Sequence, residues 1–300
     1  MASIGVLAQR AGRAAVVRLA RLSPRLALTT AAAAGYLGRA VPTDAVTLEQ
    51  LGTLLGHVPP DRLRAIRRAI YGRSERTKLL FMLLALGELR RWKPCLRVRG
   101  FERLRALVAQ RTPAVLLSWH TGPYRAVGAA LYVDGFDPLV VERRAIAHSA
   151  AVPLERVSAE GEPWRATAAL KAAVDRLRGG GLVLWAGDGY EGATGGGEVE
   201  ILGRRVVFRQ GLATLVRLSG APVLPIVASW RGGLIEVTLH PPLELAAGGA
   251  AGRTPEAIVG TAAGWLDGYL REHPEELWPE RVRELLAAPA AGKSAPVPSA

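Results

Sequence analysis

The stretch Pro113–Arg125, PAVLLSWHTGPYR, predicts the fold of this chain more clearly than any other. It opens with a continuous apolar run from Ala114 to Trp119, passes through His120 and Thr-Gly-Pro, and continues as a helix-like pattern. An apolar run that leads through a turn into a helix is typical of a parallel strand in an α/β sheet. Open α/β sheets bind their ligands at the carboxyl ends of the strands, so His120 is a candidate catalytic residue. The alternative is a histidine that only caps the helix or hydrogen-bonds locally.

Three regions follow from the pattern along the chain. Residues 1–93 are predicted to be helical, with separate helices after Asp61 and over residues 78–91, and residues 287–300 to form a disordered tail rich in Ala, Pro and Ser. Between them, over residues 94–286, strands alternate with helices, which predicts an α/β fold with a mostly parallel central sheet and helices on both faces. The predicted strands are Cys95–Val98, Ala114–Trp119, Pro138–Val141, Leu182–Ala186, Val223–Trp230 and Leu234–Leu239.

The charge of the chain indicates an anionic partner. Its 300 residues carry a net charge of +13, which favours acidic lipid or nucleic acid. Residues 1–43 hold six arginines and no acid, with apolar residues between them, as in a basic helix that lies on a membrane surface. The same region can also be a targeting peptide. A nucleic-acid binder is a further alternative on charge alone, but no DNA- or RNA-reading motif is present, so we expect no nucleic-acid partner.

Several chemistries are disfavoured by the composition. Cys95 is the only cysteine, and the five histidines have no ligand spacing, so we expect no metal site. The segment Gly187–Gly192, GDGYEG, matches a dinucleotide-binding pattern after a strand. Residues 193–197 after it are Ala-Thr-Gly-Gly-Gly, so no helix receives a pyrophosphate, and we expect neither a nucleotide fold nor a bound cofactor.

Three blocks in order resemble the bacterial lipid A biosynthesis acyltransferases, the lauroyl/myristoyl branch of the lysophospholipid acyltransferase superfamily. They are VRGFERLRALVAQRTPAVLLSWHTGPYRAVG, GGLVLWAGDGYEGATGGGEVEILGRRVVFRQGLATLVRLSGAPVLPIVASW and REHPEELWPER, spread over about residues 96–283. The resemblance implies transfer of an acyl chain from acyl carrier protein (ACP) or coenzyme A to a hydroxyl of a lipid or glycolipid. It also implies a peripheral or monotopic protein at the cytoplasmic face of the bacterial cell membrane.

One position departs from the family motif His-x4-Asp/Glu, because Arg125 stands where the acid is expected. In the family that acid orients the imidazole, which acts as general base toward the acceptor hydroxyl. An arginine has no acceptor for an imidazole N–H. Another acid can take its place, with Asp188 at the end of a neighbouring strand as first choice and Glu142 and Glu191 after it. Otherwise Arg125 binds a phosphate or carboxylate of the substrate, or the protein is an inactive relative that binds lipid or glycolipid.

The remaining candidate residues would bind substrate. Backbone N–H groups around Gly122 are expected to help hold an oxyanion. Arg204 and Arg209, together with Arg205, precede a helix that begins at Gly211 and are candidates for a phosphate or phosphopantetheine. Ordinary exposed arginines are the alternative for this group.

Overall fold

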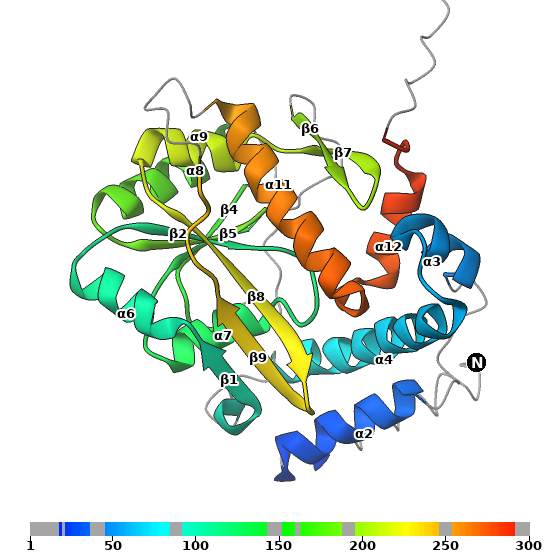
Figure 1. The fold of residues 1–300 in the computed structure, drawn as a ribbon. Helices are drawn as coiled ribbons and strands as arrows, with labels where there is room; N and C mark the ends of the chain where they lie inside the picture. The colour runs from blue at the N-terminus through cyan, green and yellow to red at the C-terminus, as the bar shows by residue number, and fades with distance from the viewer. Residues whose placement is uncertain are drawn as a thin grey trace, which may run out of the picture.

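A seven-stranded sheet, with strand order β1-β9-β8-β2-β5-β3-β4, forms the centre of the molecule (Figure 1). The computed structural model describes residues 18–19, 22–36, 46–84, 92–142, 152–159, 163–187, 196–245 and 254–291. Neighbouring strands are parallel except β8 and β9, which form an antiparallel hairpin. The prediction of a mostly parallel α/β sheet is therefore confirmed. The sheet strands are β1 Leu96–Arg99, β2 Ala114–Ser118, β3 Leu139–Glu142, β4 Arg156–Ser158, β5 Leu182–Ala186, β8 Val223–Arg231 and β9 Leu234–Leu239.

Helices cover both faces of this sheet. In β2, Val115 and Leu117 join one buried cluster, whereas Ala114 and Leu116 join another, because successive side chains of a strand point to opposite faces. The first cluster also contains residues of α8, α9 and α11, and the second contains residues of α4, α6 and α7. The helices are α2 Pro24–Tyr36, α3 Leu48–Leu55, α4 Pro60–Leu84, α6 Phe101–Ala109, α7 Ala126–Val133, α8 Pro163–Arg178, α9 Gly211–Ser219, α11 Pro255–Glu272 and α12 Pro279–Ala287. Two short 3-10 helices, η1 Lys93–Cys95 and η3 Pro274–Glu276, and a separate hairpin, β6 Gly197–Ile201 with β7 Arg204–Phe208, complete the described elements.

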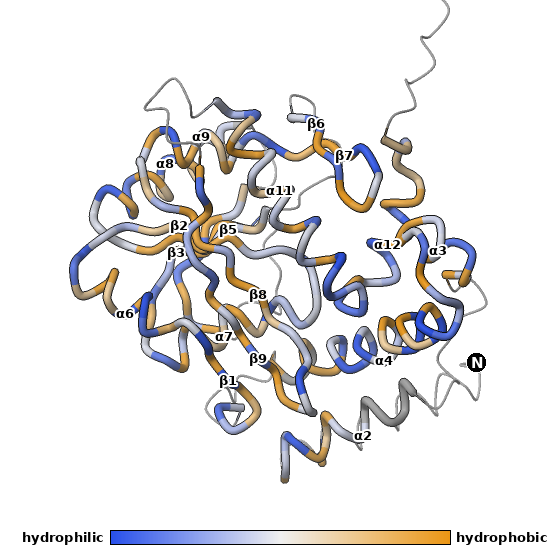
Figure 2. The backbone as a smooth tube through the Cα atoms, viewed as in Figure 1, coloured by the Kyte–Doolittle hydropathy of each residue, from blue (hydrophilic) through white to orange (hydrophobic). Residues whose placement is uncertain are grey.

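The helical region before the sheet differs from the prediction in one respect. The two helices expected after Asp61 and from residue 78 are a single 25-residue helix, α4, because no proline interrupts the chain between them. Its last turns carry Leu80, Phe81 and Leu84 into the buried cluster of the sheet. Figure 2 shows the matching pattern, with apolar residues alternating with hydrophilic ones along α4. This packing brings α4 close to the carboxyl ends of the central strands, where the site lies.

The ends of the chain add two observations. None of the helices in the described part of the chain is long and apolar enough to cross a bilayer. The basic segment before residue 18 lies outside the described residues, as does most of the predicted tail after residue 291. Residues 288–291, at the start of that tail, lie against the β6–β7 hairpin, since Arg204 forms an isolated bridge with Ala290 and the Arg205 N–H donates to Pro289 O over 2.8 Å.

Candidate active site

His120 lies just beyond the carboxyl end of β2, one of the central strands of the sheet. Its half-buried ring contacts Tyr124 edge to face, with ring centroids 4.6 Å apart. Residues 114–119 are all buried, and His120 is the first residue after them that is partly exposed. The structure therefore agrees with the position that the sequence predicted for this histidine.

The end of β5 lies level with the end of β2. Ser118 pairs with Ala186 in parallel register, and the Gly187 N–H donates to Ser118 O over 2.8 Å. In the sequence, His120 follows Ser118 by two positions, and Asp188 follows Ala186 by two positions. Asp188 and Glu191 lie outside the described residues, so their roles stay predictions.

Glu142, the other candidate acid, has a different neighbourhood. It ends β3, which lies beyond β5 from β2. Its carboxylate forms an ion pair with Arg156 over 3.3 Å, and Arg156 also donates to Val152 O over 3.0 Å. Glu142 thus stabilises the β3–β4 edge of the sheet, which makes it a weaker candidate for orienting His120.

Arg125 packs on an aromatic cluster formed by Phe81, Tyr124 and Trp278. Its guanidinium carbon lies 4.4 Å from the centre of the Phe81 ring. Phe81 in turn stacks on Trp278 with centroids 5.8 Å apart and meets Tyr124 edge to face at 5.1 Å. A guanidinium stacked on a ring keeps its N–H donors at its edge, where they can bind an anion. Arg125 therefore lies over the rings of Phe81 on α4 and of Tyr124, the residue that contacts His120.

Gly122, in the turn after His120, uses both polar groups of its backbone. Its N–H donates to Glu276 O over 2.8 Å, and its carbonyl accepts from Trp278 Nε1 over 3.0 Å. The residue adopts a φ of 50°, in the left-handed region that favours glycine. The Gly122 N–H itself is therefore engaged in this structure, so an oxyanion contact of the kind predicted here needs a neighbouring amide.

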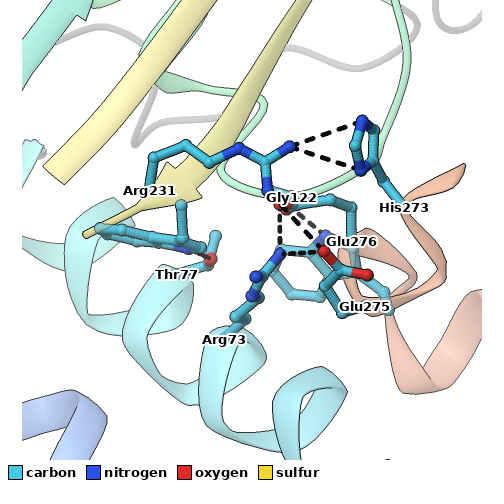
Figure 3. Close-up of polar contacts among 9 residues, drawn as sticks. Arg73, Thr77, Gly122, Arg231, His273, Glu275 and Glu276 are labelled. Atoms are coloured by element: carbon cyan, nitrogen blue, oxygen red, sulfur yellow. Dashed lines mark hydrogen bonds and ion pairs between the residues drawn. The ribbon is translucent and has the colours of Figure 1, made fainter. Parts of the chain in front are cut away.

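A group of partly buried charges, with a fully buried Glu276 carboxylate among them, lies next to this turn (Figure 3). Arg73 of α4 forms an ion pair with Glu276 and approaches Glu275 to 3.4 Å. Arg231, at the end of β8, lies 3.8 Å from Glu275 and 3.4 Å from His273 Nδ1. Burial raises the pKa of Glu276 to about 7, although the charge of Arg73 opposes this shift. Burial lowers the pKa of His273, because it disfavours the charged imidazolium, and the positive charge of Arg231 lowers this pKa further.

The site predicts a large effect of adding one methyl group at Gly122. A Cβ there would lie 2.5 Å from Ala228 O and 2.5 Å from Glu276 Oε2, in a backbone conformation that L-residues rarely adopt. We expect Gly122→Ala to lower the free energy of unfolding by about 2–5 kcal/mol, from left-handed strain plus overpacking. Denaturant unfolding measures this loss.

Gly135→Ala is the matched control for that substitution. Gly135 has a φ of 86°, but nothing lies within 4 Å of the added Cβ. Only the conformational strain is then expected, about 1–2 kcal/mol. Equal losses in the two variants would contradict the close packing of Gly122 against the C-terminal segment.

The arginines near residue 204 lie on, and just after, the second strand of the separate hairpin. Arg204 and Arg205 belong to β7, and Arg204 Nη1 donates to Ala288 O over 3.4 Å. Arg209 is exposed and directly precedes the start of α9. Of this group, Arg209 keeps the position at a helix N-terminus that the phosphate hypothesis requires.

Sequence reasoning missed the contribution of Arg73, Glu276 and Trp278. The block REHPEELWPER was recognisable only as part of the family resemblance, and nothing in its spacing indicates contact with the turn after His120. Trp278 and Gly122 are 156 positions apart. Only the folded chain brings them together.

A half-buried imidazole at the carboxyl end of a parallel strand is a candidate general base. Residues 74–276 match the family model of the bacterial lipid A biosynthesis acyltransferases. This match covers well over half of the chain, so the chain belongs to that family, and the resemblance seen in the sequence is confirmed. The family is one of acyltransferases, which supports a transferase activity. Among curated individual proteins, none matches the chain.

Proposed function

We propose that the protein is an O-acyltransferase that moves a fatty acyl chain from acyl-CoA or acyl-ACP to a hydroxyl of a lipid or glycolipid. Two facts support this proposal: the family to which residues 74–276 belong, and the position of His120 at the carboxyl end of β2. The second carries it, because a base at that edge of an α/β sheet faces the region where such sheets bind their substrates.

In the proposed reaction His120 accepts the proton of the acceptor hydroxyl through the ring nitrogen that is free of hydrogen. The acceptor oxygen attacks the thioester carbonyl, and the tetrahedral intermediate expels the thiolate. The imidazolium then returns its proton to the thiolate, so an ester and a free thiol are formed and the histidine is regenerated. The thioester supplies the activation, so the proposal needs no metal or bound cofactor.

Asp188 is proposed to orient the His120 ring in place of the acid that Arg125 replaces. The support is the register of the two strands, since Ser118 and Ala186 are paired and each candidate follows two residues later. A carboxylate that accepts an imidazole N–H holds the ring in one tautomer and stabilises its charged form.

Arg125 is proposed to bind an anionic group of the acceptor, a phosphate or carboxylate close to the reacting hydroxyl. Its stacking on Phe81 supports this role, because it fixes the guanidinium plane beside the residue that contacts His120. Arg209, before α9, is the corresponding candidate for a phosphate of the donor, with Arg204 less favoured by its hydrogen bond to Ala288.

Release of free thiol from acyl-CoA and from acyl-ACP tests this function with the full chain. We expect thiol release that depends on an added lipid or glycolipid hydroxyl. Thioester cleavage without any dependence on an acceptor, or no cleavage with any acceptor, would contradict the proposal.

The second candidate function is a catalytically inactive relative that binds lipid or glycolipid. The specific observation in its favour is Arg125 at the position of the family's motif acid. Saturable lipid binding combined with no ester formation would select this alternative.

The N-terminal helices are proposed to dock the protein on an anionic membrane surface. Leu26 of α2 is 51% exposed and Leu22, two residues before the helix begins, is 84% exposed; Arg25 of α2 and Arg18 are exposed as well. Exposed apolar side chains close to cations in one short segment suit the boundary between acyl chains and headgroups. The peripheral location at the cytoplasmic face is part of this proposal.

Replacing both exposed leucines, Leu22→Ser with Leu26→Ser, is expected to weaken binding to vesicles. Burying a leucine contributes about 1.5–3 kcal/mol, so the partition coefficient should fall on the order of tenfold or more per side chain. Co-sedimentation with vesicles of phosphatidylglycerol and phosphatidylcholine measures it. Leu218→Ser, on α9 and 51% exposed, is the matched control. Equal binding of all the variants would argue against docking through the segment around the start of α2.

A further inference from the structure

Two residues of the C-terminal segment take up the whole backbone hydrogen-bonding capacity of Gly122. We call Glu276, Leu277 and Trp278 the C-terminal clamp. The Glu276 carbonyl accepts the Gly122 N–H over 2.8 Å, and Trp278 Nε1 donates to the Gly122 carbonyl over 3.0 Å. Leu277, between them, is buried in the core. The turn that follows His120 is therefore held through both the N–H and the carbonyl of Gly122.

The C-terminal clamp is itself fixed by helix α4. Arg73 forms an ion pair with Glu276, whose carboxylate is fully buried. Further along α4, Phe81 stacks on the Trp278 ring with centroids 5.8 Å apart. The clamp thus lies between α4 and the His120 turn, with a polar contact at one end and an aromatic contact at the other.

The clamp also reaches the neighbouring strand β8. Glu275, next to the clamp, lies 3.8 Å from Arg231 at the end of that strand. Trp230, one residue earlier, donates from Nε1 to Thr77 of α4 over 2.9 Å. Figure 3 shows Arg73 of α4, Arg231 of β8 and Glu276 of η3 close to Gly122. The segment that bonds to Gly122 is therefore in contact with both α4 and β8.

The ion pair of Arg73 with the buried Glu276 carboxylate is expected to contribute little net stability to the fold. A buried ion pair loses much solvation, and replacing one with well-packed apolar residues is often neutral or stabilising. The buried Glu276 Oε2 has no hydrogen-bond partner among the described residues, which adds a further cost. What such a pair does provide is a fixed geometry, and here the fixed residue is two positions from the candidate base.

We propose that Glu276 and Trp278 are positioning residues that set the orientation of the His120 imidazole through the backbone of Gly122. The catalytic consequence rests on the proposed acyltransferase function. A general base has to lie within hydrogen-bond reach of the proton that it removes, and small misplacements reduce rates strongly. Neither residue needs to touch the substrate in this role.

Trp278→Phe is the first test, because it removes the indole N–H and keeps a ring against Phe81. We expect kcat to fall about tenfold or more, while KM for the acyl donor stays within about twofold, since only the base is misplaced. Trp164→Phe, at an exposed tryptophan of α8, is the matched control and should keep full kcat. An unchanged kcat in Trp278→Phe would overturn the proposal.

Glu276→Gln and Arg73→Gln form the second test, and the folding of each variant is checked by its melting curve. If the pair acts as one unit, each substitution lowers kcat and the double variant is little worse than the more affected single variant. Glu284→Gln, in an exposed ion pair with Arg281 on α12, is the matched control. Effects on kcat that add fully would contradict a joint role.

A spectroscopic readout separates this inference from the proposed function. The Cε1–H resonance of His120, assigned by its loss in His120→Gln, reports the environment and titration of the ring. We expect both to change in Trp278→Phe and in Glu276→Gln, but not in Trp164→Phe. Such a change without acyl transfer by the wild type would retain the clamp and reject the function. Acyl transfer by the wild type, with an unchanged resonance and unchanged kcat in both variants, would retain the function and reject the positioning role of the clamp.

Discussion

His120→Gln is expected to lower kcat/KM for acyl transfer by about 10²–10⁴-fold, the usual contribution of a positioned general base. Glutamine keeps a hydrogen-bonding side chain at the end of β2, but it cannot accept a proton from the acceptor hydroxyl. The fold should persist, because the wild-type ring is half-buried and packs on the edge of Tyr124. Initial rates at several acceptor concentrations measure the effect.

The control for this variant is His57→Gln. His57 is exposed and lies between α3 and α4, so its replacement should leave the rate unchanged. Lipid binding by His120→Gln should also be close to that of the wild type. Full turnover in His120→Gln would show that His120 is not the base. Loss of both lipid binding and turnover would instead indicate damage to the substrate site.

Asp188→Asn is expected to have the second largest effect, a fall in kcat of about 10²-fold or more. An amide in place of the carboxylate would favour the wrong imidazole tautomer and would no longer stabilise the imidazolium. The expectation comes from the parallel pairing of Ser118 with Ala186, because His120 and Asp188 each follow two positions later in the sequence.

Glu142→Gln is the comparison that makes this test specific. Glu142 already pairs with Arg156 at the far side of β5, so we expect its loss to change kcat by no more than about twofold. The reverse outcome, with full activity in Asp188→Asn and loss in Glu142→Gln, would reassign the orienting acid.

The central strands β2 and β5 could be predicted because their side chains are almost entirely apolar. β2 and β5 were recognisable as short apolar runs bounded by Gly, Pro or polar residues. β4 was not predicted, because its three residues Arg156–Ser158 are half-buried and two of them are polar. The unbroken helix α4 was predicted as two helices, because its basic middle section interrupts the apolar pattern and its continuity depends on packing against α2 and the sheet.

The position of His120 could be predicted from a rule about strand ends, but its support could not. The hydrogen bonds from Gly122 to Glu276 and Trp278 join segments about half the chain apart, and no periodicity encodes such a contact. The same holds for Arg73, which looked like one of many basic residues of an exposed helix. Arg125 was recognised as a departure from the family motif, but its stacking on Phe81 depends on how α4 docks.

Formation of the acyl ester by the wild-type chain tests the central claim most directly. Purified full-length protein would be incubated on anionic vesicles with an acyl-CoA or acyl-ACP and a panel of lipids and glycolipids that carry a free hydroxyl, and the products analysed by mass spectrometry. We predict an acceptor heavier by one acyl group, formed by the wild type and not by His120→Gln. No acylated product from any acceptor, with lipid binding intact, would contradict the account and leave a binding protein.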